Sequence, residues 1–160
     1  MSLVRTVRMR VPAGMAKPGP AIGQALGPLG INMMDFCKSF NAKTQHLLPD
    51  TPTPVVLSAF SNRTFEFVIK TPPTSWLLKR CAKIDKGAKM PGLEIVGSVG
   101  TKAIYEIAKI KARDQHLDWL PLDGIARSVA STALSMGLKI RDDMKAEDRA
   151  IAREQKAGKQ

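Results

Sequence analysis

Residues 70–74, Lys-Thr-Pro-Pro-Thr, divide the chain into two parts whose apolar residues recur with different periods. Two consecutive prolines fix their own φ angles and bias the preceding residue toward an extended conformation, so this stretch predicts a short, stiff linker. Before it the dominant period is that of strands, and after it the period is that of helices. We therefore expect two domains, residues 1–71 and 72–142, and a charged tail at 143–160.

The first part has the pattern of a small α+β domain. Residues 7–11 and 64–70 alternate apolar with polar side chains, and the apolar residues 55–60 also predict a strand, so we expect a three-stranded antiparallel sheet. Asn32 can cap a helix that runs to about Thr44, because apolar residues follow at i, i+3, i+4 and i+7. Residues 12–30 are so rich in glycine and proline that we expect a loop with room for about one turn of helix.

The second part predicts a small helical domain. Leu77, Cys81 and Ile84 share one face of a first helix, and residues 85–100 contain four glycines and predict a loop. Thr101 is expected to cap a second helix. Asp123 is expected to cap a third helix, which runs to Met136 and stops at Gly137, with a short strand at 138–140.

The charge of the chain indicates a polyanionic partner. Lysine and arginine number 25 against 14 acidic residues, a net charge of +11. The excess of positive charge is concentrated in residues 79–113, which contain nine basic residues and three acidic ones. The basic run can cover phosphates, although a solvated charged face has the same pattern. Its members are Lys79, Arg80, Lys83, Lys86 and Lys89.

The third expected helix carries a second candidate surface. One arc of its wheel is apolar, and the opposite arc is small and hydroxylic: Arg127, Ser128, Ser131, Thr132 and Ser135. Small polar side chains let a sugar–phosphate backbone approach closely and form hydrogen bonds. An ordinary solvated face is the alternative. Basic and aromatic residues are not interleaved, so an RNA partner would be recognised by shape and backbone.

Several other classes of function are disfavoured. Gly30 is followed by Ile31 and Asn32, not by the Lys-Ser/Thr of a phosphate-binding loop, and no nucleophile–base set stands out, so we expect no enzyme, cofactor, metal or small-molecule substrate. No apolar run predicts a membrane segment. Cys37 and Cys81, 44 residues apart, fit neither a disulfide framework nor a zinc site and are expected to be core thiols.

A DNA-binding three-helix regulator is the main alternative. A helix that reads the major groove needs Arg, Asn or Gln at its exposed N-terminal positions. The third expected helix offers mainly serine and alanine there, with Arg127 as its one such side chain.

Several stretches resemble the large-subunit ribosomal protein eleven family, from about residue 4 to residue 141. They are Val11–Ala16, Leu26-Gly27, Asp35–Thr44, Thr64–Phe67, Lys70–Pro73 and Ser135–Gly137. The resemblance implies a structural protein whose helical C-terminal domain binds the GTPase-associated segment of large-subunit rRNA. It also implies that the N-terminal domain is mobile and meets the stalk base and translational GTPases.

By position, the family's RNA-facing residues fall on Pro72, Pro73, Lys79, Arg80, Lys111, Thr132, Ser135 and Gly137, with Ser131 beside them. Ser131 stands where the family often has glycine. To this set the residues themselves add Lys86, Lys89, Arg127 and Ser128.

The resemblance also assigns a loop that faces factors and thiopeptide antibiotics: Pro18, Pro20, Ala21, Gly23, Gln24 and Gly27. Ala21 and Gln24 replace prolines that the family links to thiopeptide binding, and Lys38 matches a lysine that is methylated in some bacterial members. Residues 105–111 look more like mitochondrial than bacterial members. We therefore expect a mitochondrial ribosome, with the bacterial cytoplasm as the alternative.

Overall fold

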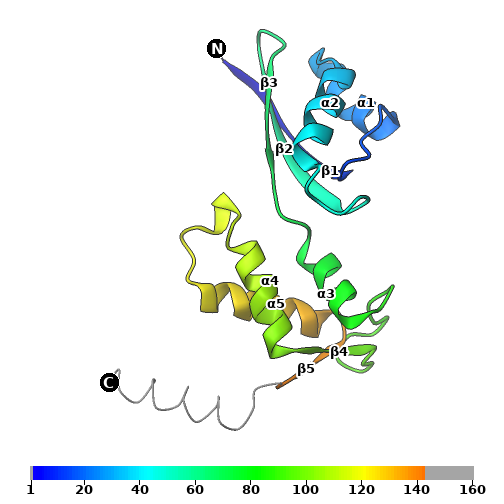
Figure 1. The fold of residues 1–160 in the computed structure, drawn as a ribbon, viewed down its shortest axis with the longest axis vertical. Coiled ribbons are helices and arrows are strands. Elements are labelled where there is room, and N and C mark those ends of the chain that lie inside the picture. The colour runs from blue at the N-terminus through cyan, green and yellow to red at the C-terminus, as the bar shows by residue number, and fades with distance from the viewer. Residues whose placement is uncertain (1, 143–160) are drawn as a thin grey trace. The chain divides into compact units, whose positions relative to one another are not determined.

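The computed structural model describes residues 2–142, which divide into one unit that ends at Pro73 and another that begins at Thr74 (Figure 1). The division falls inside the proline stretch, close to the boundary expected after Thr71. Along residues 2–142 no helix combines the length and the apolar character needed to cross a bilayer. The expected tail at 143–160 lies outside the described residues.

The first unit is built on a three-stranded antiparallel sheet of order β1-β2-β3, as the sequence predicts. β1 spans Leu3–Pro12, β2 spans Pro52–Phe60 and β3 spans Phe65–Ile69. Burial alternates along β2, so Val55, Leu57 and Ala59 share the core face. β2 begins earlier than expected because it pairs with β1 as far as Pro12↔Pro52, which extends the ladder into the predicted loop.

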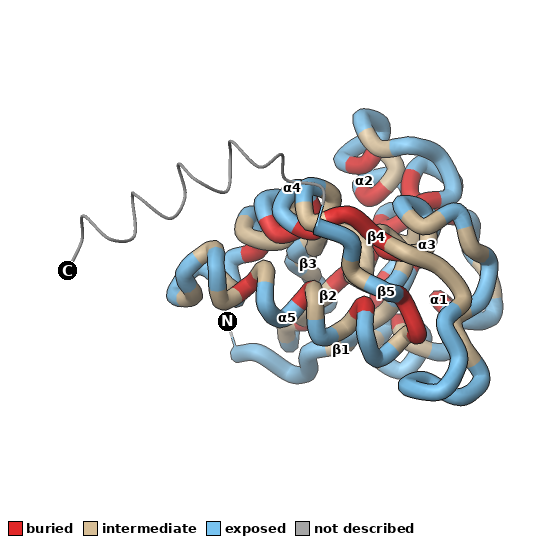
Figure 2. Tube along the Cα trace, turned by 90° about the horizontal axis from the view of Figure 1, so that it is seen from below, coloured by how far each residue is buried: buried red, intermediate tan, exposed pale blue. Residues whose placement is uncertain are grey.

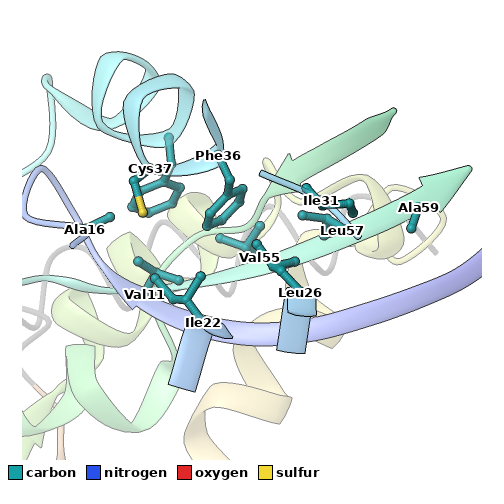
Figure 3. Close-up of a cluster of buried hydrophobic side chains, with 11 residues drawn as sticks. Val11, Ala16, Ile22, Leu26, Ile31, Phe36, Cys37, Val55, Leu57 and Ala59 are labelled. Atoms are coloured by element: carbon teal, nitrogen blue, oxygen red, sulfur yellow. The ribbon is translucent and has the colours of Figure 1, made fainter. Parts of the chain in front are cut away.

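Helix α2, Met33–Thr44, closes the core over one face of this sheet. The Asn32 side chain accepts a hydrogen bond from the Met34 amide at 3.0 Å, which confirms the predicted cap. Phe36 and Phe40 are fully buried, and the ring centroid of Phe36 lies 5.5 Å from that of Phe67 in an edge-to-face arrangement. Figure 3 shows side chains from α1, α2 and the sheet meeting in this core.

The expectation for residues 12–30 is wrong in part. The segment contains α1, Pro20–Leu26, and a 3₁₀ turn at Gly27–Leu29, so it is more helical than its composition indicates. Pro20 stands in the first turn of α1, where a missing N–H costs nothing. Ile22 and Leu26, one turn apart, are buried in the core of the unit, and this tertiary burial outweighs the low helix propensity of the glycines.

The second unit packs three helices around one core: α3 (Thr74–Ala82), α4 (Thr101–Lys111) and α5 (Leu122–Ser135). Each of these helices contributes buried residues to the core, and buried positions are coloured red along the chain in Figure 2. The main ones are Leu78, Ile104, Ile107, Ile125 and Val129. A 3₁₀ turn at Gln115–Leu117 lies between α4 and α5.

Two short parallel strands complete the second unit. β4, Gly97–Gly100, pairs with β5, Leu138–Arg141, in the register Gly97↔Leu138. The predicted strand at 138–140 is thus confirmed, but its partner lies in a segment expected to be loop. β4 begins and ends with glycine, which has a low strand propensity, so its sequence does not predict a strand. Its parallel pairing with β5 also requires a crossover connection, which α4 and α5 provide.

Three local expectations for this unit are corrected. Gly100 occupies the cap position of α4 and Pro121 that of α5, so Thr101 and Asp123 lie inside the first turns. Cys37 is buried, but Cys81 is exposed and is no core thiol. The fully buried residue of α3 is Leu78, and Leu77 and Ile84 pack against the same core as predicted, so the predicted face is wrong only at Cys81.

Candidate nucleic-acid interface

The exposed arc of α5 is the centre of the candidate interface. Ile125, Val129 and Ala133 are buried, and this fixes which arc faces outward. The opposite arc carries the hydroxylic residues predicted from the sequence, of which Thr132 is half-buried and the others are exposed: Arg127, Ser128, Ser131, Thr132 and Ser135. The structure therefore brings these five predicted site residues together on one surface.

Two hydroxyl groups on this arc already donate their hydrogens to the helix itself. Thr132 Oγ1 donates to the carbonyl of Ser128 at 2.9 Å, and Ser135 Oγ donates to the carbonyl of Thr132 at 2.9 Å. A hydroxyl has one hydrogen but two acceptor lone pairs, so both groups present acceptors to a ligand. The arc is therefore suited to a partner with hydrogen-bond donors, such as the 2′-hydroxyl groups of RNA.

Arg127 is held by a local ion pair. Its Nη2 lies 3.0 Å from Asp123 Oδ2, one helical turn earlier, and both side chains are well exposed. Such a surface pair contributes little to stability, so the guanidinium can exchange the carboxylate for a phosphate at small cost. The same pair occupies the exposed N-terminal positions of α5, where a DNA-reading helix would need free base-contacting side chains.

Gly137 terminates α5 and anchors the loop that follows α3. Its φ is +76°, a left-handed conformation that favours glycine. An added Cβ would lie 2.4 Å from Ala88 Cβ and 2.8 Å from the Glu94 carbonyl oxygen. The Ala88 amide donates to the Met136 carbonyl and the Val96 amide to the Gly137 carbonyl, each at 3.0 Å. Gly137 is thus required for close approach of the loop, whatever else it contacts.

The basic side chains of the loop lie outside this contact. Lys86 and Lys89 are exposed. The Lys89 backbone amide donates to Glu94 Oε2 at 3.2 Å, which closes the loop while the ammonium group remains in solvent. On α3, Lys79 is half-buried and Arg80 is exposed. These positions place four predicted cations on the surface of the second unit.

Lys111 is predicted to contact RNA, but in the structure it is largely buried and paired with a carboxylate. Its ammonium nitrogen lies 2.9 Å from Asp114 Oδ2, and the two side chains are only 13% and 4% exposed. A pair this buried is held by strong mutual attraction, and an exposed phosphate competes poorly for the lysine. The pair joins the last residue of α4 to Asp114. Asp114 was not among the predicted site residues.

Pro72 and Pro73 are half-buried residues that lead from β3 into α3. They belong to the first unit, which ends at Pro73. Because Thr74 begins α3 directly after them, their restricted backbone fixes the direction in which the chain enters the helix.

The predicted factor-facing loop coincides with α1 and its flanks. Pro18, Pro20, Ala21, Gln24 and Gly27 are exposed and Gly23 is half-buried. The segment before α1 is held by side chains of α2: Asn41 Oδ1 accepts from the Ala16 amide at 2.9 Å, and Asn41 Nδ2 donates to the Ala16 carbonyl at 3.1 Å.

Thr44 adds a third such contact, because its buried Oγ1 accepts from the Gly14 amide at 3.0 Å. Asn41 and Thr44 are positioning residues that hydrophobic periodicity could not find, since both are polar residues of an amphipathic helix. Lys38 of α2 is exposed and is accessible to a modifying enzyme.

Two family models match the chain, and together they span most of it. The model described as "Ribosomal protein L11, N-terminal domain" matches residues 7–65, and the model described as "Ribosomal protein L11, RNA binding domain" matches residues 70–140. The second match defines the helical unit as an RNA-binding domain.

The chain belongs to the ribosomal protein L11 family. It is a structural, non-enzymatic protein of the large ribosomal subunit that binds RNA. The predictions of family, fold class and absence of enzymatic activity are confirmed by these matches. The DNA-binding alternative is set aside.

Proposed function

We propose that the helical unit binds the GTPase-associated segment of large-subunit rRNA, and that the first unit supports docking of translational GTPases beside the stalk-base protein. The first part of the proposal is supported by the outward arc of α5. Its hydroxyl oxygens offer acceptors for 2′-hydroxyl groups, while the cations of α3 and of the loop after it can cover phosphates.

The proposed residues fall into two groups with different tasks. Lys79, Arg80, Lys86, Lys89 and Arg127 supply attraction that is independent of sequence and weakens with salt. The small residues of α5 supply close approach and directed hydrogen bonds: Ser128, Ser131, Thr132, Ser135 and Gly137. Recognition by such groups requires an RNA whose shape matches them, so it distinguishes a folded segment from an unfolded one.

The test measures binding of the full chain to the folded rRNA segment across a salt series. The controls are an RNA of the same length that cannot fold and a DNA duplex. We expect tighter binding of the folded segment at every salt concentration, since the cations act on all polyanions and the α5 arc acts on shape. Equal affinity for the folded and the unfolded RNA would contradict the proposal.

Thr132 offers a matched pair of variants for the same assay. Thr132→Val keeps the volume and removes the acceptor oxygen, and it is expected to weaken binding by about 1 kcal/mol, the net value of one hydrogen bond. Thr132→Ser keeps the hydroxyl and is expected to bind within about twofold of the wild type. Unchanged affinity of the valine variant would remove Thr132 from the interface.

For the first unit we propose that α1 and its flanks meet the translation factor. The support is the exposure of Pro18, Pro20, Ala21 and Gln24 on a segment that Asn41 anchors to α2. The test is factor-dependent GTP hydrolysis on large subunits reconstituted with an Asn41→Ala chain. Slower hydrolysis with unchanged incorporation into the subunit is expected, and unchanged hydrolysis would contradict the role of the segment.

We further propose a mitochondrial ribosome as the particle that contains this chain, on the similarity of residues 105–111 to mitochondrial members. Cell fractionation tests this directly. Co-sedimentation with mitochondrial large subunits is expected, and recovery with bacterial-type cytoplasmic subunits alone would assign the chain to the alternative compartment.

A further inference from the structure

A hollow of about 510 Å³ lies at the C-terminal end of α3, and its walls combine an aromatic ring with cations and a carboxylate. Its size is within the range of about 300–1,000 Å³ that small-ligand sites occupy. Its lining residues are Trp76, Lys79, Arg80, Lys83, Ile84 and Asp85. Trp76 and Asp85 belong neither to the basic run nor to the RNA-facing set, so the hollow adds an aromatic ring and a carboxylate to the predicted cations.

The aromatic wall is preorganised by a neighbouring cation. The Arg80 guanidinium carbon lies 5.4 Å from the centre of the Trp76 ring, a cation–π contact between residues one turn apart on α3. The indole is half-buried and therefore fixed on one side while it remains accessible on the other. A fixed, accessible ring among cations is the arrangement on which proteins stack an unpaired nucleobase.

Lys83 supplies the second argument, because its backbone is in a conformation that side-chain-bearing residues rarely adopt. Its φ is +55°, and it follows the last residue of α3. The Lys83 amide donates to the Arg80 carbonyl at 3.3 Å, and the Ile84 amide donates to the Lys79 carbonyl at 3.1 Å. Such a helix end is usually made by glycine. The chain instead has a lysine whose side chain lines the hollow.

We propose that this hollow receives one unpaired nucleotide of the RNA, with its base against Trp76 and its phosphate between Lys79 and Lys83. Asp85 is placed to accept a hydrogen bond from an amino group of the base. The inference rests on the RNA binding proposed above and adds base stacking to an interface otherwise built from backbone contacts. The competing interpretation is that the cations only complement the negative end of the α3 dipole.

The chain offers a direct reporter of stacking because it has two tryptophans, Trp76 and Trp119. Trp119 is 78% exposed, so Trp119→Phe is a mild change that leaves Trp76 as the sole tryptophan. This full-length variant is titrated with the folded rRNA segment, and binding is followed separately by filter retention. We expect quenching of Trp76 emission in step with binding.

The outcomes separate this inference from the proposed function. Binding that leaves Trp76 emission unchanged overturns the nucleotide site and leaves the proposed RNA binding intact. Absence of any binding to the folded segment overturns both. In the same assay Trp76→Leu is expected to weaken binding about tenfold, as for one lost stacking contact, and Trp76→Phe to retain most of the affinity. Equal affinity of the two variants counts against stacking.

Lys83→Gly distinguishes a binding role from a structural one. Glycine removes the backbone strain and is expected to raise the melting temperature, yet to weaken RNA binding severalfold and to lower the salt slope by about one phosphate contact. Arg63→Gly is the matched control: Arg63 has a φ of +62° but belongs to the first unit, so its affinity is expected to stay unchanged. Unchanged affinity of the Lys83 variant overturns the role of Lys83 as a phosphate ligand.

Discussion

Gly137→Ala is the substitution whose effect the structure specifies most closely. Two penalties add at this position. The φ of +76° places alanine in the left-handed region, which costs about 1–2 kcal/mol. The new Cβ would lie 2.4 Å from Ala88 Cβ and 2.8 Å from the Glu94 carbonyl oxygen, far inside contact distance, so the loop must move away.

The loop cannot move freely, and this sets the second penalty. The Ala88 amide is bonded to the Met136 carbonyl, and the Val96 amide is bonded to the Gly137 carbonyl itself. Crowding of this kind costs about 1–3 kcal/mol. We therefore expect Gly137→Ala to lower the free energy of unfolding of the second unit by about 2–5 kcal/mol in total.

Urea denaturation followed by tryptophan fluorescence measures this effect selectively, because both tryptophans belong to the second unit. Gly92→Ala is the control. Gly92 also has a positive φ, +95°, but nothing lies within 4 Å of its added Cβ, so it incurs the backbone penalty without the crowding. Equal destabilisation by the two substitutions would refute the argument that loop contact at Gly137 is tight.

Three further predictions concern buried groups. A thiol reagent should modify Cys81 rapidly in the native chain and Cys37 only on unfolding, because Cys81 is exposed and Cys37 is buried; two fast thiols would contradict this. Burial raises the pKa of the Cys37 thiol above its ordinary value of 9.0, so the folded state retains the proton longer than the unfolded state. The contribution of the Cys37 thiol to the free energy of unfolding is therefore fully present below pH 9 and is lost as the pH rises further. Cys37→Ala should make the melting temperature fall less steeply at alkaline pH, and an identical fall in the variant and the wild type would contradict this prediction. Asp114→Ala should destabilise the second unit by about 1.5–3 kcal/mol, because it removes the carboxylate that lies 2.9 Å from the Lys111 ammonium in a nearly buried pair. Asp123→Ala, which breaks an exposed pair, should change stability by less than about 1 kcal/mol; equal effects of the two substitutions would contradict this difference.

Much of the fold could be predicted from local sequence. Strand alternation at residues 7–11 and 64–70 and the apolar stripe that begins at Met33 identify elements that bury one face, and burial is what stabilises them. The outward arc of α5 follows from the same reasoning, because a helix whose Ile125 and Val129 are buried must expose the residues opposite.

The errors have a common physical cause. α1 contains Pro20 and Gly23, and β4 begins and ends with glycine, so their own propensities oppose regular structure, and contacts made far away in sequence stabilise them instead. For α1 these contacts are the burial of Ile22 and Leu26, and for β4 they are the ladder to β5. The pairing of β4 with β5 cannot be predicted from neighbouring residues, because two helices separate the strands in the sequence.

The site shows the same limit for side chains. The family resemblance places Lys111 among the RNA-facing residues, but the structure pairs it with Asp114, three residues later, in a nearly buried position. From the sequence, Thr132 and Ser135 could each donate a hydrogen bond to a ligand, but in the structure both hydroxyl groups donate to backbone carbonyls of α5. Charge and hydrogen-bonding capacity can be counted from sequence, but which of them a ligand can still reach depends on the folded contacts.

These contacts bear on the proposed selectivity of a strongly cationic protein for a folded RNA. Lysines on the surface attract any polyanion, so they set affinity and its salt dependence without discriminating between nucleic acids. The Thr132 and Ser135 hydroxyls, whose hydrogens are used within α5, present acceptors that suit 2′-hydroxyl donors better than phosphate oxygens. If the proposed discrimination comes from the hydroxyl groups of α5, the predicted loss on Thr132→Val should be nearly independent of salt, unlike the loss on removal of any lysine.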